Sequence, residues 1–141
     1  MPSAMSYNEK ILDHFTNPRN VGEIACADGF SSVGDPSCGD SAKVWIKVSN
    51  ECIAEIKFKV FGCPAAIAVC SVMTELAMGK TIDEAYEITD ETISDSLGGL
   101  PAEKEHCSNL GAVALHKAIM DYVFRSVRDA GRARGGDTRD A

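Results

Sequence analysis

Three cysteines of this chain stand where a thiol can become a metal or sulfur ligand. Cys38 lies in the turn-rich stretch GDPSCGD and is followed two residues later by Asp40. Cys63 sits between a strand-like run and a helix-like run, and Cys107 opens the last helical stretch. A glycine beside Cys38 lets the backbone approach a bound atom, and the Asp40 carboxylate adds a hard oxygen ligand.

Two of these cysteines have neighbours that favour the thiolate. Cys63 directly precedes Pro64, a residue suited to the first turn of a helix, where exposed N–H groups and the helix dipole stabilise a negative charge. Cys107 follows Lys104 and His106, so an ammonium group and an imidazole lie close in sequence. We therefore expect activated thiols at both positions.

Three thiolates with a nearby carboxylate or imidazole are sufficient to hold zinc or an iron–sulfur cluster. The separations, 25 residues from Cys38 to Cys63 and 44 from there to Cys107, do not fit a zinc-ribbon or ferredoxin pattern. A shared site would have to be assembled by the fold from distant segments.

The other three cysteines have no such setting. Cys26 has no special neighbour, Cys52 falls on the predicted core side of a strand, and Cys70 lies within an apolar helix. We interpret all three as small packing residues.

Alternation predicts the strands that must position the site. SAKVWIKVS (41–49) and CIAEIKFKVF (52–61) alternate apolar and polar residues, and the link between them is short enough for an antiparallel hairpin. A third extended piece is expected near Phe30–Val33. Trp45 falls on the non-core face beside two lysines, and we expect a helix to cover it.

Helices are predicted before and after these strands. The first covers Ser6–Phe15, with Ser6 as its cap, and a nearly all-apolar helix runs from Pro64 until Gly79 stops it. Two short helices follow, capped by Thr81 and Asp90, and the last helix spans about Cys107–Asp129. The predicted fold is α+β, a small antiparallel three-stranded sheet with helices packed on one face. Residues 1–129 form the domain and 130–141 a disordered C-terminal tail.

Composition excludes some classes of function. The chain has 141 residues, a net charge of −7 and 45% hydrophobic residues, which predicts one globular domain without a basic face for nucleic acid. No run is long and apolar enough for a membrane span, and the N-terminus lacks the apolar core of a signal peptide. We therefore predict a cytoplasmic protein whose six cysteines are not a disulfide framework.

The motifs GDPSCGD, FGCPAAIA and LPAEKEHCSNL, in this order and at these separations, resemble those of IscU/NifU-type iron–sulfur cluster assembly scaffolds. The early stretch ILDHFTNPRNVGEI is similar to the N-terminal segment of that family. The likeness covers about residues 6–127. It implies a non-enzymatic scaffold that receives sulfur from a cysteine desulfurase of IscS/NifS type, receives iron, and passes a transient [2Fe–2S] cluster to apo acceptor proteins.

The resemblance also implies roles for residues. Cys38, Cys63 and Cys107 match the cluster ligands, while Asp40 and His106 match the family's aspartate and histidine beside the cluster. Cys107 would also be the persulfide acceptor, and Lys104 matches the lysine close to it. Which of Asp40 and His106 completes the ligand set stays open.

Three departures from the family pattern stand out. Pro64 replaces a glycine, and Cys70 stands where serine is common. The loop that Hsp70-type chaperones bind in bacterial relatives reads about LPPVK there and LPAEK here, with Ala102 and Glu103.

Two alternative functions are a zinc-dependent sulfurtransferase of SufU type, which the short interval before Cys107 disfavours, and a zinc-stabilised adaptor. A homo-oligomer is also open.

Overall fold

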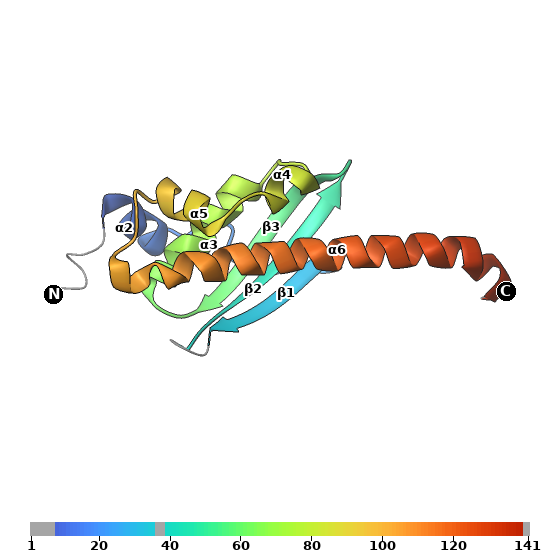
Figure 1. Ribbon diagram of the computed structural model, residues 1–141, viewed down its shortest axis with the longest axis horizontal. Coiled ribbons are helices and arrows are strands. Elements are labelled where there is room, and N and C mark those ends of the chain that lie inside the picture. Colours follow the sequence, from blue (N-terminus) through green and yellow to red (C-terminus); the bar gives the residue numbers. More distant parts are fainter. Residues whose placement is uncertain (1–7, 36–38, 140–141) are drawn as a thin grey trace.

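A three-stranded antiparallel sheet forms the base of the fold, with strands β1 (Gly29–Asp35), β2 (Asp40–Ser49) and β3 (Cys52–Phe61) in the order β1-β2-β3. The computed structural model describes residues 8–35 and 39–139. The helices gather on one face of this sheet (Figure 1). The predicted α+β class, with its three-stranded sheet, is therefore confirmed.

Six helical segments complete the chain. In order they are α2 (Glu9–Thr16), α3 (Pro64–Ala77), α4 (Ile82–Tyr86), α5 (Asp90–Ser96), the 3-10 turn η1 (Ala102–Lys104) and α6 (His106–Arg139). Helices α3 and α6 contact the sheet, α2 packs on α3, and α5 packs on α6. Among the described residues, none of the helices combines the length and apolarity that crossing a bilayer requires.

Alternation along β2 explains why only one face is covered. Ala42, Val44 and Ile46 are buried under the helices, while Lys43 points to the opposite face and is exposed. Trp45 lies on that opposite face too, half-buried, with its ring centroid 5.2 Å from that of Phe30. The expectation of a helix over Trp45 is wrong, because the helices gather on the opposite face of the sheet.

A bulge changes the start of β3 from the predicted pattern. The register shifts between Lys47 and Val48, so that Val48 pairs with Ile53 while Lys47 pairs with Glu55. Ile53 is consequently buried, Cys52 is half-buried and Ala54 is exposed. The prediction that Cys52 lies on the core face is therefore wrong, since an extra residue in one strand turns the side chains before it to the other face.

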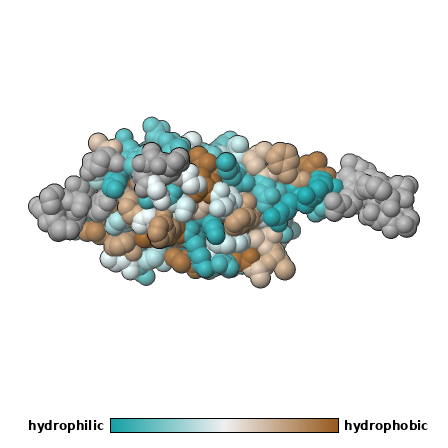
Figure 2. Space-filling model, turned by 90° about the horizontal axis from the view of Figure 1, so that it is seen from below, coloured by the Kyte–Doolittle hydropathy of each residue, from teal (hydrophilic) through white to brown (hydrophobic). Residues whose placement is uncertain are grey.

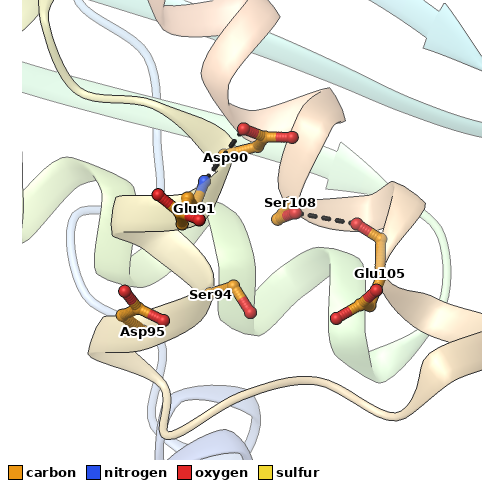
Figure 3. A pocket seen from close by; sticks show the side chains of 6 residues that line it. All are labelled: Asp90, Glu91, Ser94, Asp95, Glu105 and Ser108. Atoms are coloured by element: carbon orange, nitrogen blue, oxygen red, sulfur yellow. Dashed lines mark hydrogen bonds between the residues drawn. The ribbon is translucent and has the colours of Figure 1, made fainter.

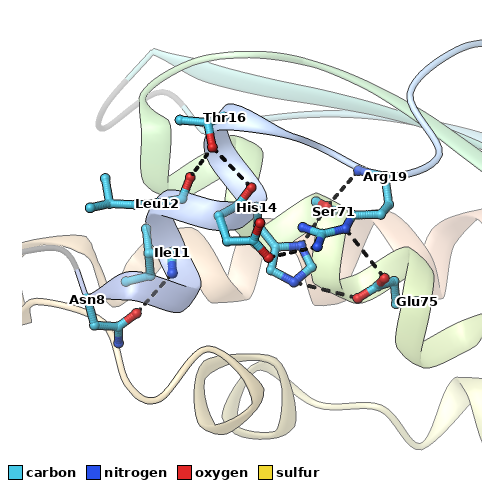
Figure 4. A network of polar contacts seen from close by, with 9 residues as sticks. Asn8, Ile11, Leu12, His14, Thr16, Arg19, Ser71 and Glu75 are labelled. Carbon is cyan, nitrogen blue, oxygen red and sulfur yellow. Dashed lines mark hydrogen bonds and ion pairs between the residues drawn. The ribbon is translucent and has the colours of Figure 1, made fainter.

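Helix α2 is fixed to α3 by a network of polar contacts (Figure 4). His14 is buried, its Nδ1 lies 2.7 Å from Ser71 Oγ, and its Nε2 lies 3.5 Å from Glu75 Oε1. The backbone N–H of Arg19 donates to the same Ser71 Oγ at 2.9 Å. Burial is the main cause that lowers the pKa of His14. The cap of α2 is Asn8; the predicted cap, Ser6, lies outside the described residues.

Helix α6 is longer than predicted. We expected it to end near Asp129, with residues 130–141 disordered, but its backbone stays helical to Arg139 and extends beyond the sheet (Figure 1). The helix therefore continues ten residues beyond its predicted end. Extending an existing helix costs far less than starting one, so these residues need no apolar contact to continue it.

Candidate metal centre

Three segments far apart in sequence bring their functional side chains to one place. Asp40 is the first residue of β2, Cys63 is the N-cap of α3, and Cys107 is the second residue of α6. Extended backbone at Cys63 (φ −78°, ψ 169°) and Pro64 in the first turn start α3 directly after the strand, as the sequence predicts. The helix start therefore fixes the position of the Cys63 thiol.

The three ligand atoms form a nearly equilateral triangle. Cys63 Sγ lies 3.8 Å from Cys107 Sγ and 3.7 Å from Asp40 Oδ2, and Cys107 Sγ lies 3.8 Å from the same oxygen. The centre of such a triangle is about 2.2 Å from each atom, close to the bond lengths of zinc to sulfur and to carboxylate oxygen. The donor set of two soft sulfurs and one hard oxygen therefore fits a transition-metal ion.

His106 adds a nitrogen at the edge of this triangle. Its Nε2 lies 3.7 Å from Cys107 Sγ, and ligand atoms of Asp40, His106 and Cys107 all lie within 4.8 Å of one another. The histidine is exposed, whereas Asp40 and Cys107 are buried. Both predicted candidates for the last ligand thus lie beside the thiols. The remaining predicted ligand, Cys38, lies outside the described residues.

Cys63 is the more accessible of the two thiols, and its pKa is lowered. A hydrogen bond with Cys107 is the largest cause that lowers the pKa of Cys63 to about 6, and contributions from the backbone of Ala66 and the charge of Lys104 act in the same direction. Burial and the Asp40 carboxylate oppose them. Cys63 is half-buried while Cys107 is fully buried, so the resting structure presents a Cys63 thiolate at neutral pH.

This pKa predicts how Cys63 reacts with an alkylating reagent. Since the thiolate is the nucleophile, the rate of Cys63 alkylation by iodoacetamide should rise with pH to a midpoint near 6 instead of near the ordinary 9. Mass spectrometry of the Cys63 peptide over a pH series measures it. In Cys107→Ala the midpoint should move up, because the main stabilising hydrogen bond is lost. A wild-type midpoint above 8 would contradict the assignment.

Gly62 is a site residue that sequence reasoning missed. A Cβ added at Gly62 would lie 2.6 Å from Asp40 Oδ1 and 2.7 Å from Asp40 Cγ, far inside van der Waals contact. The missing side chain therefore makes room for the carboxylate to face the two thiols. The sequence places a glycine beside Cys63, but nothing in it reveals that β2 brings Asp40 against that glycine.

We expect Gly62→Ala to displace the Asp40 carboxylate. The closeness of Asp40 Cβ, at 3.1 Å, means that a small rotation of the carboxylate does not relieve the clash. The free energy of unfolding should fall by about 1–3 kcal/mol, as for other overpacked sites, and zinc affinity measured by competition with a chelator should fall with it. Gly34→Ala is the matched control, because a Cβ there meets nothing within 4 Å. Equal zinc affinity in the two variants would refute this role of Gly62.

The other cysteines lie apart from the triangle. Cys70 is fully buried, and burial raises its pKa to about 12, so it is a protonated packing residue as predicted. Cys26 is exposed, and its φ of 56° places it in a tight turn. Cys26, Cys52 and Cys70 form no disulfide.

A separate cavity of about 330 Å³ lies between α5 and the start of α6 (Figure 3). Its lining consists of carboxylates and hydroxyls from Asp90, Glu91, Ser94, Asp95, Glu105 and Ser108. None of the predicted site residues lines it, so the acidic cavity is distinct from the candidate metal centre.

Comparison with known proteins identifies the family to which this chain belongs. A family model described as the NifU-like N terminal domain matches residues 6–129, and the chain belongs to this family. It is 56% identical over 120 residues to "Iron-sulfur cluster assembly scaffold protein IscU 1" of Archaeoglobus fulgidus, covering 85% of this chain and 78% of that protein. It is 46% identical over 130 residues to the IscU scaffold of Escherichia coli K12, covering 89% of this chain and 99% of that protein.

A solved structure supports the fold alone. The crystal structure of a putative iron–sulfur cluster assembly scaffold protein for the SUF system from Fervidobacterium islandicum AW-1 superposes with a TM-score of 0.69 and 24% identity. The match covers 83% of this chain and 98% of that chain.

Proposed function

We propose that this chain is a scaffold on which a transient [2Fe–2S] cluster is assembled from iron and sulfur and then passed to apo acceptor proteins. The observation that carries the proposal is the triangle of Asp40, Cys63 and Cys107, whose edges are 3.7–3.8 Å. Its members come from three distant segments of a chain that belongs to the NifU-like N terminal domain family. The relatives named as IscU scaffolds support the same function.

In this proposal the ligands have different strengths. Cys38, Cys63 and Cys107 supply soft thiolates to iron, while Asp40 or His106 supplies the weaker remaining bond. A site with one weak ligand releases its cargo more readily than a site with four thiolates. The same donors suit zinc, which can occupy them before iron arrives.

Sulfur arrives as a persulfide in this proposal. A thiolate of the scaffold attacks the outer sulfur of a persulfide carried by a cysteine desulfurase of IscS/NifS type. The new S–S bond forms on the scaffold as the old one breaks, and the desulfurase cysteine leaves as a thiolate. We assign this acceptor role to Cys107, with the Lys104 ammonium nearby to stabilise negative charge. In this proposal the chain is a carrier and not an enzyme, because it holds sulfur and the cluster and passes them on.

The proposal also includes a chaperone partner and a cellular location. The loop LPAEK before Cys107 is the segment that an Hsp70-type chaperone would grip, with Ala102 and Glu103 as its departures from the relatives' pattern. Assembly would take place in the cytoplasm.

Anaerobic reconstitution tests the proposed function. The chain is incubated with ferrous iron, cysteine and a cysteine desulfurase, and the product is analysed by Mössbauer spectroscopy. We expect the signal of a [2Fe–2S] cluster, its loss in Cys63→Ser, and its retention in Cys26→Ser, which alters an exposed thiol outside the site. A chain that takes up sulfur and zinc but builds no cluster would instead be a sulfurtransferase.

A further inference from the structure

A groove between α4 and α6 lies outside the candidate metal centre. It encloses about 460 Å³ and is lined by Ile82, Asp83 and Tyr86 of α4, by Glu87 directly after α4, and by Ile119, Met120 and Val123 of α6. The two helices are joined at one end of it, where the ring of Tyr86 lies 4.7 Å from that of His116 and His116 Nε2 lies 2.7 Å from the carbonyl oxygen of Ile88. Helix α4 therefore runs beside residues 116–123 of α6.

The apolar surface continues along α6 beyond the groove. Met120, Phe124 and Val127 are spaced by four and three residues, the spacing of a helix seam that packs on another helix. Phe124 and Val127 are 67% and 66% exposed, and together with the groove they extend the apolar surface, a feature that marks interaction sites when it is contiguous. In the space-filling view from below, brown apolar surface reaches the point where α6 leaves the body of the molecule (Figure 2).

Charges of opposite sign flank this seam. On one side α4 presents the exposed carboxylates of Asp83 and Glu87, next to Val123. On the other side, at about 60° from Met120 around the helix and close to Phe124, lies the exposed Lys117. The surface is thus acidic on the α4 flank, while the other flank has a net positive charge from Lys117, Arg125 and Arg128 against Asp121, which pairs with Arg125.

We propose that α6 of a second copy of this chain occupies the groove, with the two α6 helices parallel and related by a two-fold axis. A two-fold axis along parallel helices places the acidic flank of each copy against the basic flank of the other. Antiparallel helices would bring like flanks together. The opposite charges on the two flanks therefore select the parallel arrangement.

Two contacts define this interface. Phe124 of each copy enters the apolar groove of the other, between α4 and α6. Lys117 of each copy faces Glu87 of the partner subunit, since both lie at the level of the His116–Tyr86 contact. Cys107 begins the same helix 13 residues before Met120, about 20 Å away, so the interface leaves the candidate metal centre open.

Sedimentation equilibrium of the full chain over a range of concentrations tests the dimer without any cluster. We expect a dimer for the wild type, and a dissociation constant at least about a hundredfold higher for Phe124→Asp, because two central aromatic contacts are lost. Phe61→Asp is the matched control, because Phe61 is 79% exposed but lies on β3, outside the proposed interface. The dissociation constant of this variant should equal that of the wild type. Circular dichroism verifies that each variant is folded.

Charge reversal tests the orientation of the helices. Lys117→Glu and Glu87→Lys should each raise the dissociation constant by about tenfold, and the double variant should recover most of this loss. A wild type that stays monomeric, or an unchanged dimer in Phe124→Asp, would overturn the interface. Failure of the double variant to recover would overturn the parallel arrangement. None of these readouts depends on the proposed cluster assembly.

Discussion

A chain carrying Cys107→Ser is expected to capture no persulfide sulfur from a cysteine desulfurase, while the wild type captures one sulfur atom at this position. A serine hydroxyl is not deprotonated at neutral pH and forms no stable bond to a persulfide sulfur, so the loss should be complete. The measurement is mass spectrometry of the intact chain and of its Cys107 peptide after incubation with the desulfurase and cysteine.

Two variants make this result specific. Cys26→Ser removes an exposed thiol outside the site and should capture sulfur as the wild type does. Undiminished persulfide on Cys107→Ser would contradict the assignment and transfer the acceptor role to Cys63. That outcome has a physical basis, because Cys63 is half-buried with a pKa of about 6 whereas Cys107 is fully buried in the resting structure.

Asp40→Ala is expected to slow the transfer of an assembled cluster to an apo acceptor by about tenfold, which corresponds to about 1.4 kcal/mol in the barrier. The carboxylate is the hard donor among the soft sulfurs, and its Oδ2 lies 3.7–3.8 Å from both thiols. In the proposed function Asp40 supplies the weak bond, so its removal should take away the bond through which the cargo is most easily exchanged. Transfer is followed by the change in visible circular dichroism when the cluster moves to a ferredoxin-type acceptor.

The control for Asp40 is another carboxylate of the same chain. Asp95 is exposed and lines the acidic cavity between α5 and α6, so Asp95→Ala changes the net charge equally without touching the triangle. Its transfer rate should equal that of the wild type. If Asp40→Ala also transfers at the wild-type rate, Asp40 has no part in release, and His106 becomes the remaining candidate for the weak ligand.

The sequence was sufficient to predict the elements that carry the site. Alternation in β2 and β3, the proline after Cys63 and the spacing of the apolar residues in the helices are local signals, and the corresponding elements are present. Cys63 at a helix start and Cys107 at the beginning of the last helix follow from the same signals. The position of each of these two cysteines was therefore predictable from its own segment of sequence.

The features that were missed depend on contacts between segments. Gly62 has its role only because Asp40 of another strand lies against it, and no local pattern records that contact. The bulge in β2 and β3 turns Cys52 and Ala54 away from the core although their alternation is regular. Likewise, the burial of Cys107 comes from packing around the start of α6, whereas its sequence neighbours Lys104 and His106 are polar.

The three site residues span about half of the chain, and this has a consequence for stability. Asp40 is 23 residues from Cys63 and 67 from Cys107, so an ion bound between them closes two long loops at once. Cargo bound there would act as a removable cross-link, and we expect the loaded protein to resist unfolding more than the empty one. The coupling is reciprocal, so a partner that opens the first turn of α3 or α6 would lower the affinity of the site for its cargo. Release of the cargo would then require only a local opening of one helix end.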